Sequence, residues 1–353
     1  MPAGSYGGSG RVTAVDVCYP RSRSPMTSAI AMLYRAFYDG VLSRLPEPAA
    51  IALGQTALRL LPVDRLSVFR LQDPRLRTTL GGVPLTNPLI LAAQYYDPRI
   101  LRRAMGLGFG AVTAKTITVN PRPGHPQPNL VRRRSAAGPG LVNCNGFQNP
   151  GLQGFAASIA ELPHRVPLIV SVAGESVDDY VSLVRSLAPL GDLIEINISS
   201  PNTKLVYAWN ERPQELRAVL QGLAAVSPRP VILKLSPDFG DANERDIIPA
   251  ALEAGVRIVN YGNTRRIEDR RLSQGVGGLS GPEIFAGTLA NLQRTRKRFG
   301  DALEIIATGG VDSPDKAAVL LAEGARAVGY FTGFVTRGPI LARRILERLV
   351  RGL

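Results

Sequence analysis

The segment Asp192-Leu-Ile-Glu-Ile-Asn-Ile-Ser-Ser-Pro-Asn-Thr203 predicts a buried strand that ends in a ligand site. Its apolar first half is typical of a strand covered on both faces, as in parallel sheets. Its second half sets two carboxamides, Asn197 and Asn202, around the hydroxyl of Ser200. These neutral hydrogen-bonding groups suit a planar, amide-rich ligand better than a phosphate, a metal or a nucleic acid strand. We expect the amides to orient the ligand while the hydroxyl touches its reacting carbon.

Similar short β-rich runs occur before and after this segment, and a helical pattern follows each of them. The expected strands are 88–92, 111–115, 168–173, 193–197, 231–235, 257–261, 304–307 and 327–330. The expected helices are 98–107, 151–161, 176–188, 213–225, 242–253, 282–298, 313–322 and 338–350. Eight strands that alternate with helices predict an α/β fold, the (β/α)8 or TIM barrel, rather than an open sheet. Nearly every unusual polar residue follows a strand, on the face where such barrels build their sites.

The N-terminal part of the chain predicts two further regions. Residues 1–27 are rich in Gly, Ser, Pro and Arg without periodicity and predict a disordered tail. Residues 28–78 predict a helical extension, with apolar residues at helical spacing in its two helices, 27–45 and 49–61. This helical pair either lies in a lipid interface, as an element of membrane binding, or simply packs on the main domain. Residues 79–353 are the expected catalytic barrel.

The composition favours a protein that touches an anionic surface. The chain has 353 residues, a net charge of +14 and a pI near 10.3. It contains no block of five or more like charges, so we favour a membrane surface over nucleic acid, with an ordinary basic exterior as the alternative. No apolar run reaches the ~18 residues that span a bilayer, and the N-terminus lacks a signal-peptide pattern. We expect a peripheral protein on the cytoplasmic side of the membrane, or a soluble cytoplasmic one.

The sequence argues against a metal site and a disulfide. The two histidines, His125 and His164, have no metal-ligand spacing to another soft ligand. The two cysteines, Cys18 and Cys144, stand far apart and suggest no disulfide framework.

Two of the five lysines and two pairs of glycines stand out in the expected barrel. Lys115 and Lys234 either extend to the barrel rim or bind a ligand carboxylate and the negative charge that develops on a cofactor ring. The pairs Gly277-Gly278, with Gly281 close behind, and Gly309-Gly310 precede helical patterns and predict a phosphate site. No GxGxxG motif follows a first strand, so a flavin mononucleotide (FMN) fits better than NAD.

With these motifs the chain resembles the dihydroorotate dehydrogenases, FMN enzymes that oxidise dihydroorotate to orotate in pyrimidine synthesis. The resemblance runs from about residue 28 to the C-terminus. It rests on Asn87-Pro-Leu, Gly108-Phe-Gly, Pro121-Arg-Pro-Gly, Asn197-Ile-Ser-Ser-Pro-Asn-Thr203, Gly277-Gly-Leu-Ser-Gly281, Thr308-Gly-Gly-Val-Asp-Ser313 and Gly333-Phe334. The serine in the long motif and the N-terminal helical pair resemble the membrane-associated, quinone-dependent class.

The resemblance implies a role for each matched residue. Ser200 is the implied base that removes the C5 proton of dihydroorotate, while the hydride from C6 passes to the flavin. The implied substrate-binding residues are Lys115, Asn143, Asn197, Asn202, Asn263 and Thr264. The implied FMN-binding residues are Ala93, Thr116, Ser171, Asn197, Lys234, Gly262, Gly281, Gly310, Phe331 and Thr332. Arg132 falls where the quinone-dependent class has an arginine at the quinone tunnel.

The chain departs from that class after the first barrel strand. It reads Leu91-Ala-Ala-Gln-Tyr-Tyr-Asp97, where the class has a glycine and then an Asp-Lys pair whose lysine binds the substrate carboxylate. Lys115 and Ser171 instead resemble the soluble classes, and Phe331 replaces a tyrosine. We therefore favour a quinone-linked dihydroorotate dehydrogenase. Two alternatives stay open: a flavin oxidoreductase for another dihydropyrimidine or cyclic amide, and a flavin-binding protein without turnover.

Overall fold

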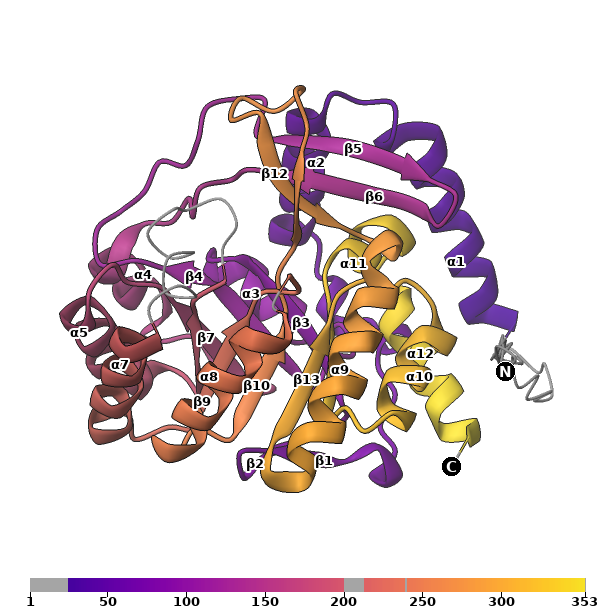
Figure 1. The fold of residues 1–353 in the computed structure, drawn as a ribbon. Helices are drawn as coiled ribbons and strands as arrows, with labels where there is room; N and C mark the ends of the chain where they lie inside the picture. Colours follow the sequence, from indigo (N-terminus) through magenta and orange to yellow (C-terminus); the bar gives the residue numbers. More distant parts are fainter. Residues whose placement is uncertain (1–24, 200–212, 239, 353) are drawn as a thin grey trace, which may run out of the picture.

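Eight parallel strands close into a barrel in the computed structural model, which describes residues 25–199, 213–238 and 240–352. The strands are β3 (Leu89–Tyr95), β4 (Ala111–Ile117), β7 (Leu168–Val172), β8 (Leu193–Asn197), β9 (Val231–Leu235), β10 (Ile258–Tyr261), β13 (Glu304–Thr308) and β14 (Ala327–Tyr330). Each strand pairs with the next in sequence, and β14 returns to pair with β3. The predicted (β/α)8 barrel is confirmed, and each strand lies at a predicted position (Figure 1).

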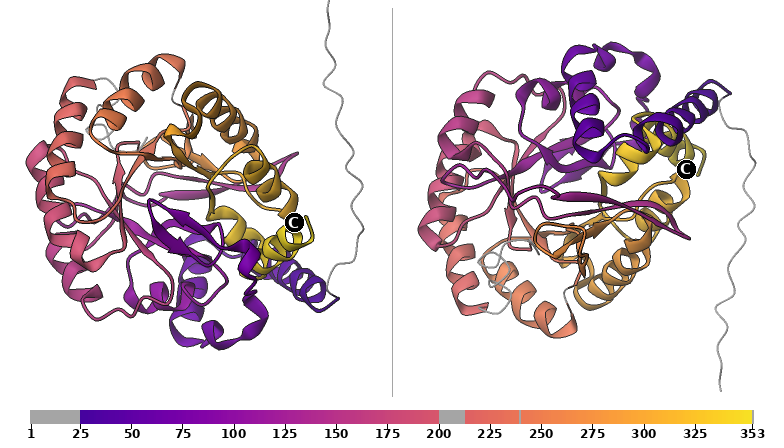
Figure 2. Two further views of the ribbon diagram at one scale, coloured as in Figure 1. Left: turned by 90° about the horizontal axis from the view of Figure 1, so that it is seen from below. Right: turned by 90° about the horizontal axis from the view of Figure 1, so that it is seen from above.

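Helices surround this ring on its outer side (Figure 2). They are α3 (Pro98–Ala104), α4 (Gly151–Ile159), α5 (Val177–Leu187), α7 (Pro213–Val226), α8 (Asp241–Glu253), α9 (Phe285–Phe299), α10 (Pro314–Ala322), α11 (Thr332–Arg337) and α12 (Ile340–Gly352). Side-chain caps start several of them, as when Ser176 accepts a hydrogen bond from the Asp179 amide at the start of α5. The short helix α11 was not predicted, and Gly338, with φ 80°, separates it from α12.

The inside of the barrel is layered because successive side chains of a strand point to opposite faces. On β8, Ile194 and Ile196 pack outward in the large core beneath the helices, whereas Leu193 packs inward. The inward side chains nearest the amino ends of the strands form an apolar layer that includes Ile169, Ile232, Ile258 and Ile306. The hairpin of β1 (Thr78–Leu80) and β2 (Val83–Leu85) adds Leu80 and Leu85 to this layer and closes that end of the barrel (Figure 1).

A four-stranded antiparallel sheet covers the opposite end of the barrel and was not predicted (Figure 1). Its strands, in spatial order, are β11 (Arg265–Glu268), β12 (Val276–Ser280), β6 (Gly138–Asn143) and β5 (Leu130–Ser135). The prediction that Gly277-Gly278 forms a phosphate loop is wrong, because both residues lie inside β12. A Cβ on Gly277 would stand 2.8 Å from the carbonyl oxygen of Asn143, so glycine here permits close strand packing.

The N-terminal extension folds as α1 (Pro25–Phe37), a π-helical turn (Tyr38–Leu42) and α2 (Glu47–Leu60). Helix α1 packs against α11 and α12, and α2 packs against α3 and β5. The boundary of the expected tail was set too late, because residues 25–27 already belong to α1 and Thr27 donates a hydrogen bond to Glu347. The rest of that tail, residues 1–24, lies outside the described residues.

The extension also leaves large apolar side chains exposed. They are Met26, Met32, Leu33, Phe37, Val41, Ile51, Leu53, Leu60, Leu61 and Leu66. Leu33 and Leu60 are 70% and 71% exposed, and α2 buries no residue completely. The extension therefore both packs on the barrel and presents an apolar surface. Within the described ranges, no helix is long and apolar enough to cross a membrane.

Asp64 anchors the segment that joins the extension to the barrel. Its carboxylate is fully buried, lies 2.5 Å from Arg103 Nη1 on α3, and accepts a 2.8 Å hydrogen bond from Arg165 Nη1. Desolvation acts to raise the pKa of this carboxyl, but the hydrogen bond and charge of Arg103 and the charge of Arg165 lower it below its usual 3.8. The folded state therefore holds Asp64 in its ionised form.

We expect Asp64→Asn to lower the free energy of unfolding by about 3–5 kcal/mol at neutral pH, because it leaves Arg103 buried without its counter-ion. A carboxyl whose folded pKa is lowered stabilises the protein above its unfolded pKa, and this contribution is lost as the pH falls through the folded value. Urea unfolding of both proteins should therefore show a difference at pH 7 that shrinks below about pH 4.

The matched control is Asp39→Asn. Asp39 lies 3.6 Å from Arg35 in a pair whose side chains are both more than half exposed, so its loss should leave the urea midpoint unchanged. Equal effects of the two substitutions would contradict the anchoring role of Asp64.

Candidate active site

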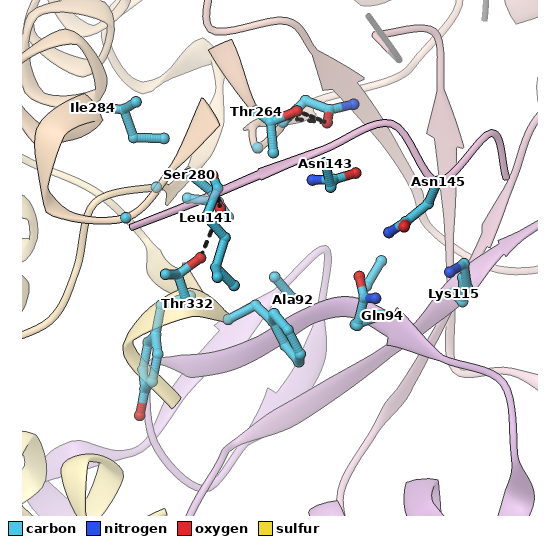
Figure 3. Close-up of a pocket in the computed structure, with 18 of the residues that line it drawn as sticks. Ala92, Gln94, Lys115, Leu141, Asn143, Asn145, Thr264, Ser280, Ile284 and Thr332 are labelled. Carbon is cyan, nitrogen blue, oxygen red and sulfur yellow. Dashed lines mark hydrogen bonds between the residues drawn. The ribbon is translucent and has the colours of Figure 1, made fainter. Parts of the chain in front are cut away.

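A pocket opens at the carboxyl ends of the barrel strands, beneath the four-stranded sheet. Figure 3 shows Gln94, Lys115, Asn143 and Asn145 gathered around one end of it, with Ser280, Ile284 and Thr332 toward the other. The predicted residues that line it are Ala93, Lys115, Thr116, Asn143, Asn197, Lys234, Gly262, Asn263, Thr264, Gly281, Gly310, Phe331 and Thr332. Residues from strands and loops across the whole chain thus meet at one place.

Two predicted residues, Ser200 and Asn202, lie outside the described residues. Two others are described but do not line the pocket. Ser171 is fully buried and exchanges a 3.0 Å hydrogen bond with Thr116, so it reaches the pocket only through that neighbour. Arg132 lies on β5, where it contacts the N-terminal extension.

Asn197 organises the base of the pocket. Its Nδ2 donates a 2.9 Å hydrogen bond to Thr116 Oγ1. Its Oδ1 accepts from both the amide (3.1 Å) and the hydroxyl (3.0 Å) of Ser199, and that hydroxyl also accepts a 3.1 Å bond from Asn263 Nδ2. The carboxamide is therefore fixed on both sides, and it joins β4, β8 and the loop after β10 into one polar surface.

Lys234 lines the pocket with its ammonium group paired from below. Nζ lies 3.2 Å from Oε1 of Glu195, and Oε2 of Glu195 accepts a 2.7 Å hydrogen bond from Asn260 Nδ2. No acidic residue was predicted near the pocket, so Glu195 is an addition from the structure. Strand alternation was a usable signal, because Leu193, Glu195 and Asn197 point to one face of β8.

Lys115 is the second cation of the pocket, and it has no acidic partner among the described residues. It comes from β4, one strand away from Gln94 on β3. Burial lowers the pKa of its ammonium group from 10.5 to about 8. A ligand that brings a carboxylate to this end of the pocket would supply the missing negative charge and stabilise the charged form of the lysine.

Glycines shape the other end of the pocket. Gly281, Gly309 and Gly310 have φ values of 109°, 131° and 75°, which favour glycine. A Cβ on Gly310 would stand 2.5 Å from the backbone of Phe285, so the loop after β13 has no room for a side chain there. Beside these glycines, Thr332 Oγ1 donates a 2.9 Å hydrogen bond to Ser280 Oγ (Figure 3). Small residues and backbone groups thus surround this end of the site.

Aromatic residues also line the pocket, among them Phe147 and Phe331. Phe331 meets Tyr95, which does not itself line the pocket, edge to face with ring centroids 5.5 Å apart. Phe147 lines the pocket with φ 56°, an uncommon backbone conformation for a residue other than glycine. The pocket therefore has apolar walls next to its polar base.

Arg132 connects β5 to the N-terminal extension. Its Nη2 donates a 2.8 Å hydrogen bond to the carbonyl oxygen of Leu42, and its Nη1 lies 3.3 Å from Glu47. Both partners flank the turn between α1 and α2. The guanidinium therefore lies at the junction between the exposed apolar helices and the sheet that covers the pocket.

Comparisons with known proteins agree on one family. The sequence profile described as dihydroorotate dehydrogenase matches residues 75–353. A relative from Chloroflexus aurantiacus, named dihydroorotate dehydrogenase (quinone), is 31% identical over 91% of this chain and 97% of its own. One from Mycobacterium tuberculosis with the same name is 33% identical over 80% of this chain and 82% of its own. A crystal structure of DHODH from Eimeria tenella in complex with ferulenol superimposes with a TM-score of 0.77 at 26% identity, covering 89% of this chain and 93% of that one.

Proposed function

Because the chain belongs to the dihydroorotate dehydrogenase family and is an oxidoreductase, we propose that it oxidises dihydroorotate to orotate in pyrimidine biosynthesis, with FMN as cofactor and a quinone as electron acceptor. One observation carries the substrate assignment. The ammonium of Lys115, which has no acidic partner among the residues that the structure describes, shares one end of the pocket with the amides of Asn143 and Asn145. Dihydroorotate combines a carboxylate with a cyclic diamide, which matches both features.

The residues of the pocket fit an FMN group. Asn260 has a buried Oδ1 with no partner in the described part of the chain, and it lies against Gly262 in the pocket wall. Asn260 itself does not line the pocket, so the fit rests on the polar base and on the glycines with positive φ at the other end. Thr116, Asn197 and Lys234 would hold the ring at the base, and backbone groups at Gly281, Gly310 and Thr332 would hold the phosphate. When bound, FMN supplies a hydride acceptor.

The cation of Lys234 would favour negative charge on the ring bound above it, as preorganised electrostatic stabilisation requires. Thr116, itself bonded to Ser171, and Asn197 would fix the ring so that the substrate lies against one face. Thr116, Ser171 and Asn197 come from separate strands, and their side chains already bond to one another. Binding therefore requires little rearrangement.

We propose Ser200 as the base that removes the substrate C5 proton. The assignment rests on the Asn-Ile-Ser-Ser-Pro-Asn motif, since Ser200 itself is not among the described residues. Supporting it, the preceding Ser199 is fully buried and bonded to Asn197 and Asn263, both of which line the pocket. A serine hydroxyl has a pKa far above the ~7 ideal of a general base, so we expect this step to depend strongly on exact placement.

We further propose that the N-terminal extension docks on a membrane surface, where quinone is available. The exposed Leu33 and Leu60, with the other apolar side chains of α1 and α2, favour contact with lipid. Arg132, between this surface and the pocket, is the candidate residue for contact with the quinone. The net charge of +14 adds attraction to anionic lipid head groups.

The function is tested by anaerobic titration of the flavin-loaded protein. Dihydroorotate should bleach the visible flavin absorption, whereas dihydrouracil, the same ring without the carboxylate, should not. Ser200→Ala should slow bleaching by about 10²-fold or more while orotate still binds, because the proton has no acceptor. A protein that holds no flavin would refute the proposal, and equal bleaching by the two compounds would favour another cyclic amide as substrate.

Lys115→Met should weaken orotate binding by about 3 kcal/mol, roughly a hundredfold in Kd, because the carboxylate loses its partner. In the unmutated protein the affinity for orotate should fall as the pH rises through about 8, since the neutral amine no longer attracts the carboxylate. The variant should bind with little dependence on pH between 7 and 9. Lys297→Met, which removes an exposed lysine on α9, is the control and should behave like the unmutated protein. Unchanged affinity in Lys115→Met would remove this residue from the site.

Replacing Leu33 and Leu60 together with serine should weaken binding to anionic vesicles at least tenfold, because each buried leucine contributes about 1.5–3 kcal/mol. Vesicle co-sedimentation measures this effect. Reduction of the bound flavin by dihydroorotate should stay unchanged, while turnover with a long-chain quinone should fall. Val319→Ser, which changes an exposed apolar residue on α10, is the control. Unaltered vesicle binding of the double variant would contradict membrane docking through the extension.

A further inference from the structure

One acidic side chain lies inside the barrel just beneath the pocket. Glu195 is 1% exposed and points inward from β8, between the apolar layer at the closed end and Asn197 at the open end. Desolvating a carboxylate costs several kcal/mol unless partners compensate it. A protein retains such a group only where its partners satisfy it.

Both oxygens of this carboxylate are used. Oε1 accepts from Lys234 at 3.2 Å, and Oε2 accepts from Asn260 at 2.7 Å. Lys234 lines the pocket, whereas neither Glu195 nor Asn260 does. The carboxylate thus acts on a ligand in the pocket mainly through the lysine.

The pair also fixes where the ammonium group can lie. Lys234 is 6% exposed and pairs in register with Asn197 on one side and Asn260 on the other. An ammonium group has three donors, and the contact with Glu195 uses one of them. Among the described residues only Glu195 is bonded to this ammonium group, which leaves its other two donors for a ligand in the pocket.

We propose that Glu195 is a positioning residue that lowers the reduction potential of the bound cofactor by holding Lys234 and offsetting part of its positive charge. This inference rests on the proposed function, because it requires FMN in the pocket. A cation beside the cofactor favours its reduced, more electron-rich form. A carboxylate 3.2 Å from that cation opposes the effect, and so helps the reduced cofactor pass its electrons to the acceptor.

The test compares the reduction potential of the bound flavin in the unmutated protein and in Glu195→Gln, which keeps the shape and removes the charge. In Glu195→Gln we expect the ratio of reduced to oxidised flavin, at a fixed solution potential, to be at least tenfold higher than in the unmutated protein. For a two-electron couple this is a shift of at least about 30 mV to more positive potential. Equilibration with a reference dye under anaerobic conditions measures the shift. An unchanged or more negative potential would overturn the proposal.

Glu244→Gln is the matched control. Glu244 is also fully buried and bonded to Tyr261, Thr295 and Arg294, but it lies on α8 outside the strand ring. Its loss should lower thermal stability and leave the flavin potential unchanged. If both variants shift the potential equally, the shift is a general effect of losing a buried carboxylate, and the specific role of Glu195 is overturned.

A double variant keeps the test decisive if Glu195→Gln does not fold. Glu195→Gln with Lys234→Met replaces the pair by neutral groups of similar size, so no buried charge is left alone. Its flavin potential should not be more positive than that of the unmutated protein, because the lysine through which Glu195 acts is gone. A more positive potential in the double variant would overturn that coupling. If the protein holds no flavin, the proposed function itself fails. If dihydroorotate bleaches the flavin but the potentials do not move, only the role of Glu195 fails.

Discussion

Closing eight parallel strands into a ring forces every second side chain of each strand into a shared interior, where each side chain must be satisfied by its neighbours. At the closed end the interior is filled by isoleucine, leucine and alanine side chains that pack on the β1–β2 hairpin. One layer higher it holds polar groups that bond to one another, with Glu195 paired to Lys234 and Asn260. The transition from apolar to polar along the same strands gives the pocket its base.

The two lysines of the pocket have complementary environments. Lys234 receives its counter-ion from the fold, so its charge is present and positioned before any ligand arrives. Lys115 has no acidic partner in the described part of the chain, and burial makes its charge less favourable. The first arrangement suits a resident group that changes charge during a reaction, and the second suits a carboxylate that comes and goes. On the proposed function, the placement of a single glutamate would separate cofactor chemistry at Lys234 from substrate recognition at Lys115.

The sequence predicts the barrel well because each strand is a short apolar run with a polar residue at its carboxyl end, and it predicts most lining residues for the same reason. It does not predict β5 and β11, since their arginines hide the alternation expected of strands. Gly277 was predicted to belong to a phosphate-binding loop, because glycine is common both in loops and in tightly packed strands. Strand alternation places Glu195 on the same face of β8 as Asn197, but one charge inside an apolar run does not identify its partners on other strands, Lys234 and Asn260. Ser171 was predicted to bind the cofactor, but it reaches the pocket only through Thr116. The sequence does not distinguish a hydroxyl that lines a pocket from one that bonds to the lining residue.

The β1–β2 hairpin has a consequence for how molecules reach the base of the pocket. With Leu80 and Leu85 sealing one end, the barrel is a blind chamber, and traffic to Lys234 has to pass the face that carries the four-stranded sheet. An oxidation involves two reactants that visit the same cofactor. In such a chamber they either take turns at a common entrance or arrive through separate openings around the cover. The cover formed by β5, β6, β11 and β12 therefore bears on whether the two reactants share an entrance.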